Sequence, residues 1–205
     1  MKSIAALILA GGLSSRMKQD KALLQINGED LLCRQHRIVS DILGVENVYV
    51  SGLRPGYQSI EDQDSGLGPV EGLRSACVYF MQNMTYESLL LLPVDMPYLD
   101  KKTLNHLLSL ADVDVDLIRF EGHQFPIVFN NISKLCKTIE GLKLSCQRAR
   151  EFVDVESKRY SFKELFKVLN SIELKVENEF CFQNVNTPEE FIAAISKANI
   201  AFADR

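Results

Sequence analysis

The chain has 205 residues, of which 46% are hydrophobic, and it carries a formal net charge of −4. This size and apolar content fit one α/β domain with a substantial core. The negative charge disfavours a duplex or a long RNA as partner, and no apolar stretch approaches the roughly 20 residues of a membrane span. We therefore expect a single cytoplasmic domain over residues 1–205, with no nucleic-acid or membrane partner.

The first predicted element is a buried strand, residues 4–9, which ends in the glycine-rich turn LAGGLSSRMKQDK. Gly11 and Gly12 lack a Cβ, so the backbone can approach a ligand closely, and Arg16 and Lys21 bring positive charge to the same turn. Neither the dinucleotide fingerprint nor the P-loop motif matches these glycines. The turn predicts a polyphosphate site, although a bare GG turn also occurs between strand and helix in ordinary α/β proteins.

Apolar, strand-like runs alternate with segments of helical period over the first two thirds of the chain. Strands are predicted near residues 4–9, 47–50, 89–92, 115–120 and 126–129. Helices are predicted near residues 30–43, 70–82 and 101–110. This alternation is typical of βαβ units and predicts a Rossmann-like, three-layer α/β/α fold with a mostly parallel sheet.

Two further motifs are expected at the edge of the sheet that carries the glycine turn. Pro69 in GPVEGL suits the first position of a helix, whose free N–H groups then face that edge. Asp95 in LLLLPVDMP follows a buried strand and offers the hard oxygen that Mg²⁺ prefers, unless it is only a turn or cap residue. Asp62 in SIEDQ is a second carboxylate for the metal, a ligand of the base or ribose, or a turn former.

Beyond residue 130 the pattern becomes more polar, and residues 142–160 fit either a flap or a solvated helix pair. In FQNVNTPEEF a short strand is predicted to run through Asn184 and Asn186 into Thr187, which would cap the next helix.

Four blocks resemble the MobA-like nucleotidyltransferases, the molybdenum cofactor guanylyltransferases. In chain order they are LAGGLSSRMKQDKALL, DSGLGPVEGL, LPVDMPYL and FQNVNTPEEF. The resemblance implies Mg²⁺-dependent transfer of GMP from GTP to the molybdenum-molybdopterin cofactor, with release of pyrophosphate. It also implies a GTP-binding part over residues 1–110 and an acceptor-binding part over residues 111–205, both approximate. Transient contact with other cofactor-biosynthesis proteins or with molybdoenzymes is left open.

The resemblance also assigns roles to single residues. Nucleotide contacts would come from Leu9, Ala10, Gly11, Gly12, Lys21, Ser51, Asp62 and Asp95. Asp95 would also hold the metal, and together with Arg16 and Lys21 it would form the catalytic set. Asn184 and Asn186 would bind the acceptor.

The chain departs from the family pattern at a few positions, and two alternatives stay open. Lys18 replaces a usual glycine, Ser51 stands where an asparagine commonly contacts guanine, and Glu71 adds a negative charge near the predicted anion site. One alternative is a cytidylyltransferase or another nucleotidyltransferase acting on a phosphorylated acceptor. The other is a noncatalytic protein that binds nucleotide or cofactor and escorts it.

Overall fold

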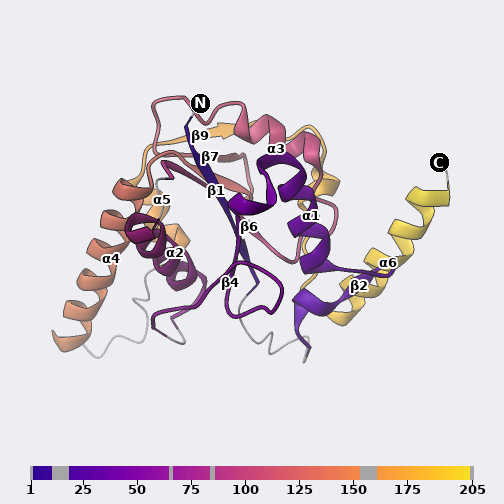
Figure 1. Cartoon of the computed structure of the whole chain (residues 1–205), viewed down its shortest axis with the longest axis horizontal. Helices are drawn as coiled ribbons and strands as arrows, with labels where there is room; N and C mark the ends of the chain where they lie inside the picture. The colour runs from indigo at the N-terminus through magenta and orange to yellow at the C-terminus, as the bar shows by residue number, and fades with distance from the viewer. Residues whose placement is uncertain (1, 11–18, 65–66, 84–85, 153–160, 204–205) are drawn as a thin grey trace.

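The structure of the chain is a computed structural model (Figure 1). It describes residues 2–10, 19–64, 67–83, 86–152 and 161–203. These residues form an α/β domain around a central twisted sheet, as the sequence predicts. No helix within these ranges is long and apolar enough to cross a membrane.

The central sheet has seven strands among the described residues, in the order β5-β4-β1-β6-β8-β7-β9. These strands are β1 (Ile4–Leu9), β4 (Val48–Ser51), β5 (Ser59–Ile60), β6 (Ser88–Pro93), β7 (Leu117–Phe120), β8 (Ile127–Phe129) and β9 (Ser171–Leu174). Only β8 runs antiparallel to its neighbours, so the sheet is mostly parallel, as predicted. A separate hairpin pairs β2 (Gln25–Ile26) with β3 (Glu29–Asp30).

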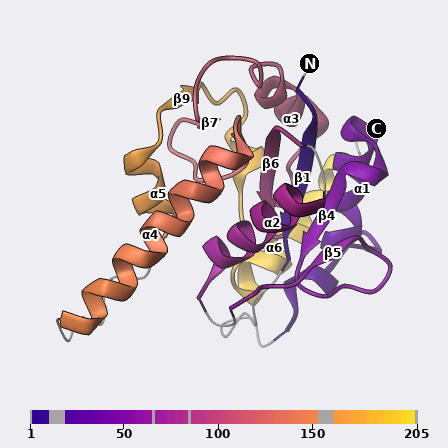
Figure 2. The same ribbon diagram turned by 60° about the vertical axis from the view of Figure 1, so that its left-hand side comes forward.

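Helices cover both faces of the sheet and give the predicted three layers (Figures 1 and 2). The helices are α1 (Leu31–Leu43), α2 (Pro69–Asn83), α3 (Lys101–Leu108), α4 (Ile132–Phe152), α5 (Phe162–Val168) and α6 (Pro188–Ala203). The described residues also form short 3₁₀ turns at η1 (Lys21–Leu23), η2 (Val45–Asn47) and η3 (Glu179–Phe182). One face packs against α1, α3 and α6, and the other packs against α2, α4 and α5.

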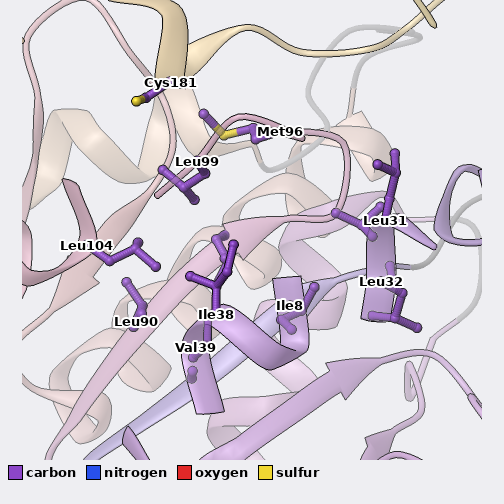
Figure 3. Close-up of a cluster of buried hydrophobic side chains, with 14 of the residues drawn as sticks. Ile8, Leu31, Leu32, Ile38, Val39, Leu90, Met96, Leu99, Leu104 and Cys181 are labelled. Carbon is purple, nitrogen blue, oxygen red and sulfur yellow. The ribbon is translucent and has the colours of Figure 1, made fainter. Parts of the chain in front are cut away.

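The uninterrupted apolar sequence of β1 follows from this double cover. Ala6 and Ile8 belong to the core beneath α1, while Ala5 and Leu7 belong to the core beneath α2. Figure 3 shows Ile8 among the side chains of the first of these cores, including Leu31 of α1. Burying one large aliphatic side chain contributes roughly 1.5–3 kcal/mol to the stability of the fold. Because the central strands bury side chains on both faces, this contribution favours their position in the middle of the sheet.

The predicted elements differ from the observed ones in the C-terminal third. The short strand through Asn184 and Asn186 is wrong, because this stretch makes no sheet ladder; instead the Val185 N–H donates to the carbonyl of Asp95. The first part of residues 142–160 continues α4 to Phe152, so it is neither a flap nor a helix pair. Residues 153–160 lie outside the described ranges.

Candidate active site

The ends of β1, β4 and β6 bring three of the predicted nucleotide contacts close together. Leu9 lies opposite Pro93 on one side and opposite Ser51 on the other. The Val94 N–H donates to the Leu9 carbonyl over 3.1 Å, which places the following residue, Asp95, beside the end of β1. Ligands of open α/β sheets bind at this carboxyl edge.

Lys21 connects this edge to the C-terminal part of the chain. Its Nζ donates to Oδ2 of Asp95 over 2.6 Å and to Oδ1 of Asn186 over 2.7 Å. We call these three residues the rim cluster. The Lys21 and Asp95 side chains are 17% and 16% exposed. An ammonium has three N–H groups, so Nζ can donate to an anionic ligand as well as to these two acceptors.

The loop that carries Asp95 is held by α1. Nε2 of the buried Gln35 donates to the Met96 carbonyl over 2.5 Å, and Nε of Arg34 donates to the Pro97 carbonyl over 2.7 Å. Sequence reasoning missed both supports. The available signal was Gln35 itself, a polar residue on the otherwise apolar face of a predicted helix.

Asn186 is positioned by the start of α6. The Val185 N–H donates to the Asp95 carbonyl over 2.9 Å, so the segment before α6 lies against the Asp95 loop. The Asn186 N–H donates to Oε2 of Glu190 over 2.6 Å. The Thr187 N–H donates to the same Oε2 over 3.2 Å, and the Glu190 N–H donates back to Oγ1 of Thr187 over 3.2 Å. This capping box confirms Thr187 as the N-cap.

Asn184 has a different setting from Asn186. It is exposed and lines a surface pocket of about 270 Å³ together with Tyr98 and Glu190. The structure therefore brings Asn186 to Lys21, whereas Asn184 lies beside the cluster, at the pocket next to α6.

Ser51 and Asp62 form a second polar pair at the same edge. The Ser51 hydroxyl donates to the Asp62 carboxylate, and a Cβ on Gly72 would lie only 2.5 Å from Oγ of Ser51 and 3.2 Å from Oδ1 of Asp62. Burial and the nearby charge of Glu71 raise the pKa of Asp62, and the bond from Ser51 opposes this rise. Gly72 thus leaves the space in which the pair forms.

Glu71 belongs to an ion-paired group between α2 and α4, which we call the buried cluster and define as Glu71, Arg74 and Lys143. Glu71 is fully buried and accepts a bond of 2.6 Å from Nη2 of Arg74. Nζ of Lys143 lies 3.4 Å from its Oε2. The bond to Glu71 raises the pKa of Arg74. The expected negative charge at the anion site is therefore paired.

Arg54 is a residue of this edge that sequence reasoning missed. It follows β4 by three positions, and its guanidinium binds the Ala10 carbonyl and the Asp20 carboxylate. The signal was its place in SGLRP, directly after a predicted strand whose carboxyl end lies at the ligand edge. The predicted contacts at Gly11, Gly12 and Arg16, and the departure at Lys18, fall outside the described residues.

The Asp95 carboxylate lies beside the end of β1 and is partly exposed. Within the described parts of the chain, no group of three or more histidine, cysteine, aspartate or glutamate side chains could form a protein-only cage. Mg²⁺ is commonly held by one or two carboxylates together with phosphates of a substrate, and a single partly exposed aspartate fits that mode.

Comparison with known proteins decides the family. Residues 6–160 match the MobA-like NTP transferase domain. The chain belongs to this family. A molybdenum cofactor guanylyltransferase from Xanthomonas euvesicatoria pv. vesicatoria is 32% identical over 184 residues, which cover 90% of each chain. A probable molybdenum cofactor guanylyltransferase from Pelotomaculum thermopropionicum is 28% identical over 204 residues, covering 95% of this chain and 93% of the relative.

Solved structures of family members and of other nucleotidyltransferases share the fold. Molybdopterin-guanine dinucleotide biosynthesis protein A from Archaeoglobus fulgidus has a TM-score of 0.70 at 18% identity, covering 95% of this chain and 98% of its own. The 4-diphosphocytidyl-2C-methyl-D-erythritol synthase from Anaerococcus prevotii has a TM-score of 0.68 at 12% identity, covering 97% and 96%. These similarities confirm the predicted nucleotidyltransferase fold.

Proposed function

We propose that this protein transfers GMP from GTP to the molybdenum-molybdopterin cofactor and releases pyrophosphate. The observation that carries the proposal is the position of Lys21 Nζ between Asp95 Oδ2 and Asn186 Oδ1, at 2.6 and 2.7 Å. This contact unites a cation of the glycine-turn motif, a carboxylate for a metal and an amide of the acceptor motif. The names of the sequence relatives support guanylyl transfer.

GTP would bind across the ends of β1, β4 and β6. Leu9 and Ala10, with Gly11 and Gly12, would offer backbone contacts to the phosphates, and Arg16 and Lys21 would neutralise their charge. Ser51 and Asp62 would serve the nucleoside, because both are polar groups at this edge and both lie close to the Cα of Gly72.

The reaction would be an in-line displacement. An oxygen of the terminal phosphate of molybdopterin attacks the α-phosphorus of GTP, the bond from that phosphorus to the α–β bridging oxygen breaks, and pyrophosphate leaves with the electron pair. The attacking phosphate is already ionised, so no general base is required. Lys21 donates to phosphate oxygens as negative charge builds on the leaving group, and Asn186 orients the acceptor.

Asp95 would hold Mg²⁺ together with the phosphates of GTP. When bound, the ion supplies Lewis-acid stabilisation of the phosphate charge. Lys21 already donates to Oδ2 of Asp95, so it holds this carboxylate in place for that role.

The approximate division into a GTP-binding part over residues 1–110 and an acceptor-binding part over residues 111–205 belongs to this proposal. Asn186 would then bring the acceptor part to Lys21 of the nucleotide part. Transient contact with other cofactor-biosynthesis proteins or with molybdoenzymes would deliver or receive the cofactor.

The test combines purified protein with Mg²⁺, molybdopterin and either GTP, CTP or ATP, and follows both pyrophosphate and the dinucleotide product. We expect both products with GTP, and their loss when EDTA replaces the metal. Products with CTP alone would overturn the base assignment and make the protein a cytidylyltransferase. No product with any nucleotide, despite measurable GTP binding, would favour the escort protein.

A further inference from the structure

Arg54 is fixed before any ligand arrives. Its N–H donates to Oγ of Ser59 over 2.9 Å, and the same hydroxyl donates to the Arg54 carbonyl over 3.0 Å. The Tyr57 N–H also donates to the Arg54 carbonyl, over 3.2 Å. Both backbone groups of Arg54 are therefore bonded within the turn that links β4 to β5, and this limits where its side chain can reach.

The guanidinium of Arg54 bridges two segments that lie on either side of residues 11–18. Nη2 donates to the Ala10 carbonyl over 2.6 Å and to Oδ1 of Asp20 over 3.0 Å, and Nη1 donates to Oδ2 of Asp20. Ala10 follows β1, and Asp20 immediately precedes Lys21. A guanidinium is planar and permanently charged, so it can donate to a carbonyl and a carboxylate at the same time in a fixed geometry. The single ammonium of a lysine cannot reproduce this geometry.

Asp20 connects the Arg54 guanidinium to the turn that begins at Lys21. Its Oδ1 accepts a bond of 3.0 Å from the Ala22 N–H, so it caps η1, whose first residue is Lys21. Burial by itself raises the pKa of Asp20, but the bonds from Arg54 and the Ala22 N–H and the charge of Arg54 together lower it. Asp20 is thus ionised and fixed at neutral pH.

We infer that Arg54 is a positioning residue for phosphate binding, which holds the end of β1 and, through Asp20, the start of η1 so that Lys21 meets Asp95. The inference rests on the proposed function, since the ligand it serves is GTP. Arg54 acts here through Ala10 and Asp20, and its partners in the described residues already occupy two edges of its guanidinium.

The experiment compares Arg54→Met, Arg54→Lys and Asp20→Asn. Asparagine caps a helical turn as well as aspartate does but removes the charge that pairs with Arg54. We expect Arg54→Met to weaken GTP binding, measured by calorimetry, and to lower kcat/KM by roughly ten- to a hundredfold. Asp20→Asn should change both quantities in the same direction by a smaller factor, and Arg54→Lys should recover only part of the loss.

The control is Arg37→Met. Arg37 makes a comparable two-pronged pair with Glu29, at 2.8 and 2.9 Å, but it has no bond to the rim cluster. This variant should keep the wild-type GTP affinity and kcat/KM. A loss equal to that of Arg54→Met would mean that any lost surface pair perturbs the enzyme, and it would overturn the inference.

A second readout does not depend on turnover. Acetic anhydride labels accessible amines, and peptide mass spectrometry gives the labelling rate of Lys21 relative to the exposed Lys167. We expect this ratio to rise in Arg54→Met and in Asp20→Asn, because Lys21 then leaves Asp95 more often. An unchanged ratio in Arg54→Met would contradict the inference even if the wild type is fully active. A wild type that releases no pyrophosphate from any nucleotide would instead refute the proposed function.

A direct phosphate contact by Arg54 has its own signature. In that case Asp20→Asn would free the guanidinium for the ligand, so GTP affinity would be unchanged or stronger while Arg54→Met weakens it. That pair of results would replace the positioning role by a binding role.

Discussion

The rim cluster and the buried cluster both pair charged side chains, but they differ in how far those side chains reach solvent. At the rim, Lys21 pairs with Asp95, and their side chains are 17% and 16% exposed. In the buried cluster, Glu71 has no exposed side-chain surface and Arg74 has 8%. Both clusters join distant parts of the chain, yet only the first lies where a ligand can reach it.

This difference in exposure separates two roles. The Lys21–Asp95 pair lies at the ligand edge of the sheet and keeps some contact with solvent, so a bound ligand can offer Lys21 new acceptors in exchange. Removing one partner of a buried pair leaves an unpaired charge in the protein interior, so the buried cluster should matter to the fold. Its Arg74 and Lys143 connect α2 to α4, which pack side by side (Figure 2).

Breaking the buried cluster should give the largest change. Arg74→Met leaves the buried Glu71 without its main partner, and we expect the free energy of unfolding to fall by about 3–5 kcal/mol. Urea denaturation followed by circular dichroism measures this loss. A decrease no larger than that of an exposed pair, such as Lys167→Met on α5, would contradict a stabilising role for the cluster.

Breaking the rim cluster should affect turnover instead. Lys21→Ala removes a preorganised donor to the phosphates, and we expect kcat/KM to fall by about 10²–10³-fold with little change in the melting temperature. Pyrophosphate release with GTP and differential scanning calorimetry give the two values. Lys167→Ala, which removes only an exposed pair with Glu164, is the matched control. Near-normal turnover in Lys21→Ala would remove Lys21 from the mechanism.

Substitution of Gly72 tests the polar pair of Ser51 and Asp62. Gly72→Ala places a Cβ 2.5 Å from Oγ of Ser51 and should separate Ser51 from Asp62. We expect KM for GTP to rise several-fold while the helix itself gains about 0.5–1 kcal/mol from alanine. Gly141→Ala on α4 is the control, since nothing lies within 4 Å of its added Cβ. An equal KM in the two variants would argue against a nucleotide role for this pair.

The pH dependence should give the smallest change. The bond from Ser51 opposes the burial and the Glu71 charge that raise the pKa of Asp62, so Ser51→Ala should raise this pKa further. An acid with a higher pKa stays protonated to a higher pH. The acidic limb of the plot of kcat/KM against pH should therefore shift to higher pH. Asp62→Asn should abolish that limb. A limb that stays in place in both variants would show that it belongs to another group.

The sequence predicted the fold well where burial determines it. The apolar run of β1 and the fully buried residues of β6 are covered on both faces, and such strands are recognisable because nearly every position is apolar. The stretch around Asn184 and Asn186 was predicted wrongly, since its alternation of apolar and polar residues also fits an irregular segment, here held by bonds of Val185 to Asp95 and of Asn186 to Lys21.

The candidate site was predicted where one motif carries both position and chemistry. Lys21 and Asp95 belong to motifs that were expected at one edge of the sheet, and the structure brings them together with Asn186. Arg54 and Gln35 were not predicted, because their importance depends on which backbone carbonyls they reach. Such contacts between segments far apart in sequence leave no local pattern.

In the proposed mechanism, Lys21 and Asp95 act as one unit on GTP. This joint action is tested most directly by kcat/KM of the double variant Lys21→Ala/Asp95→Ala beside the two single variants, all checked for folding by circular dichroism. Residues that act as a unit give strongly non-additive losses, so we predict that the double variant is about as slow as the slower single variant. A loss equal to the product of the two single losses would contradict the account.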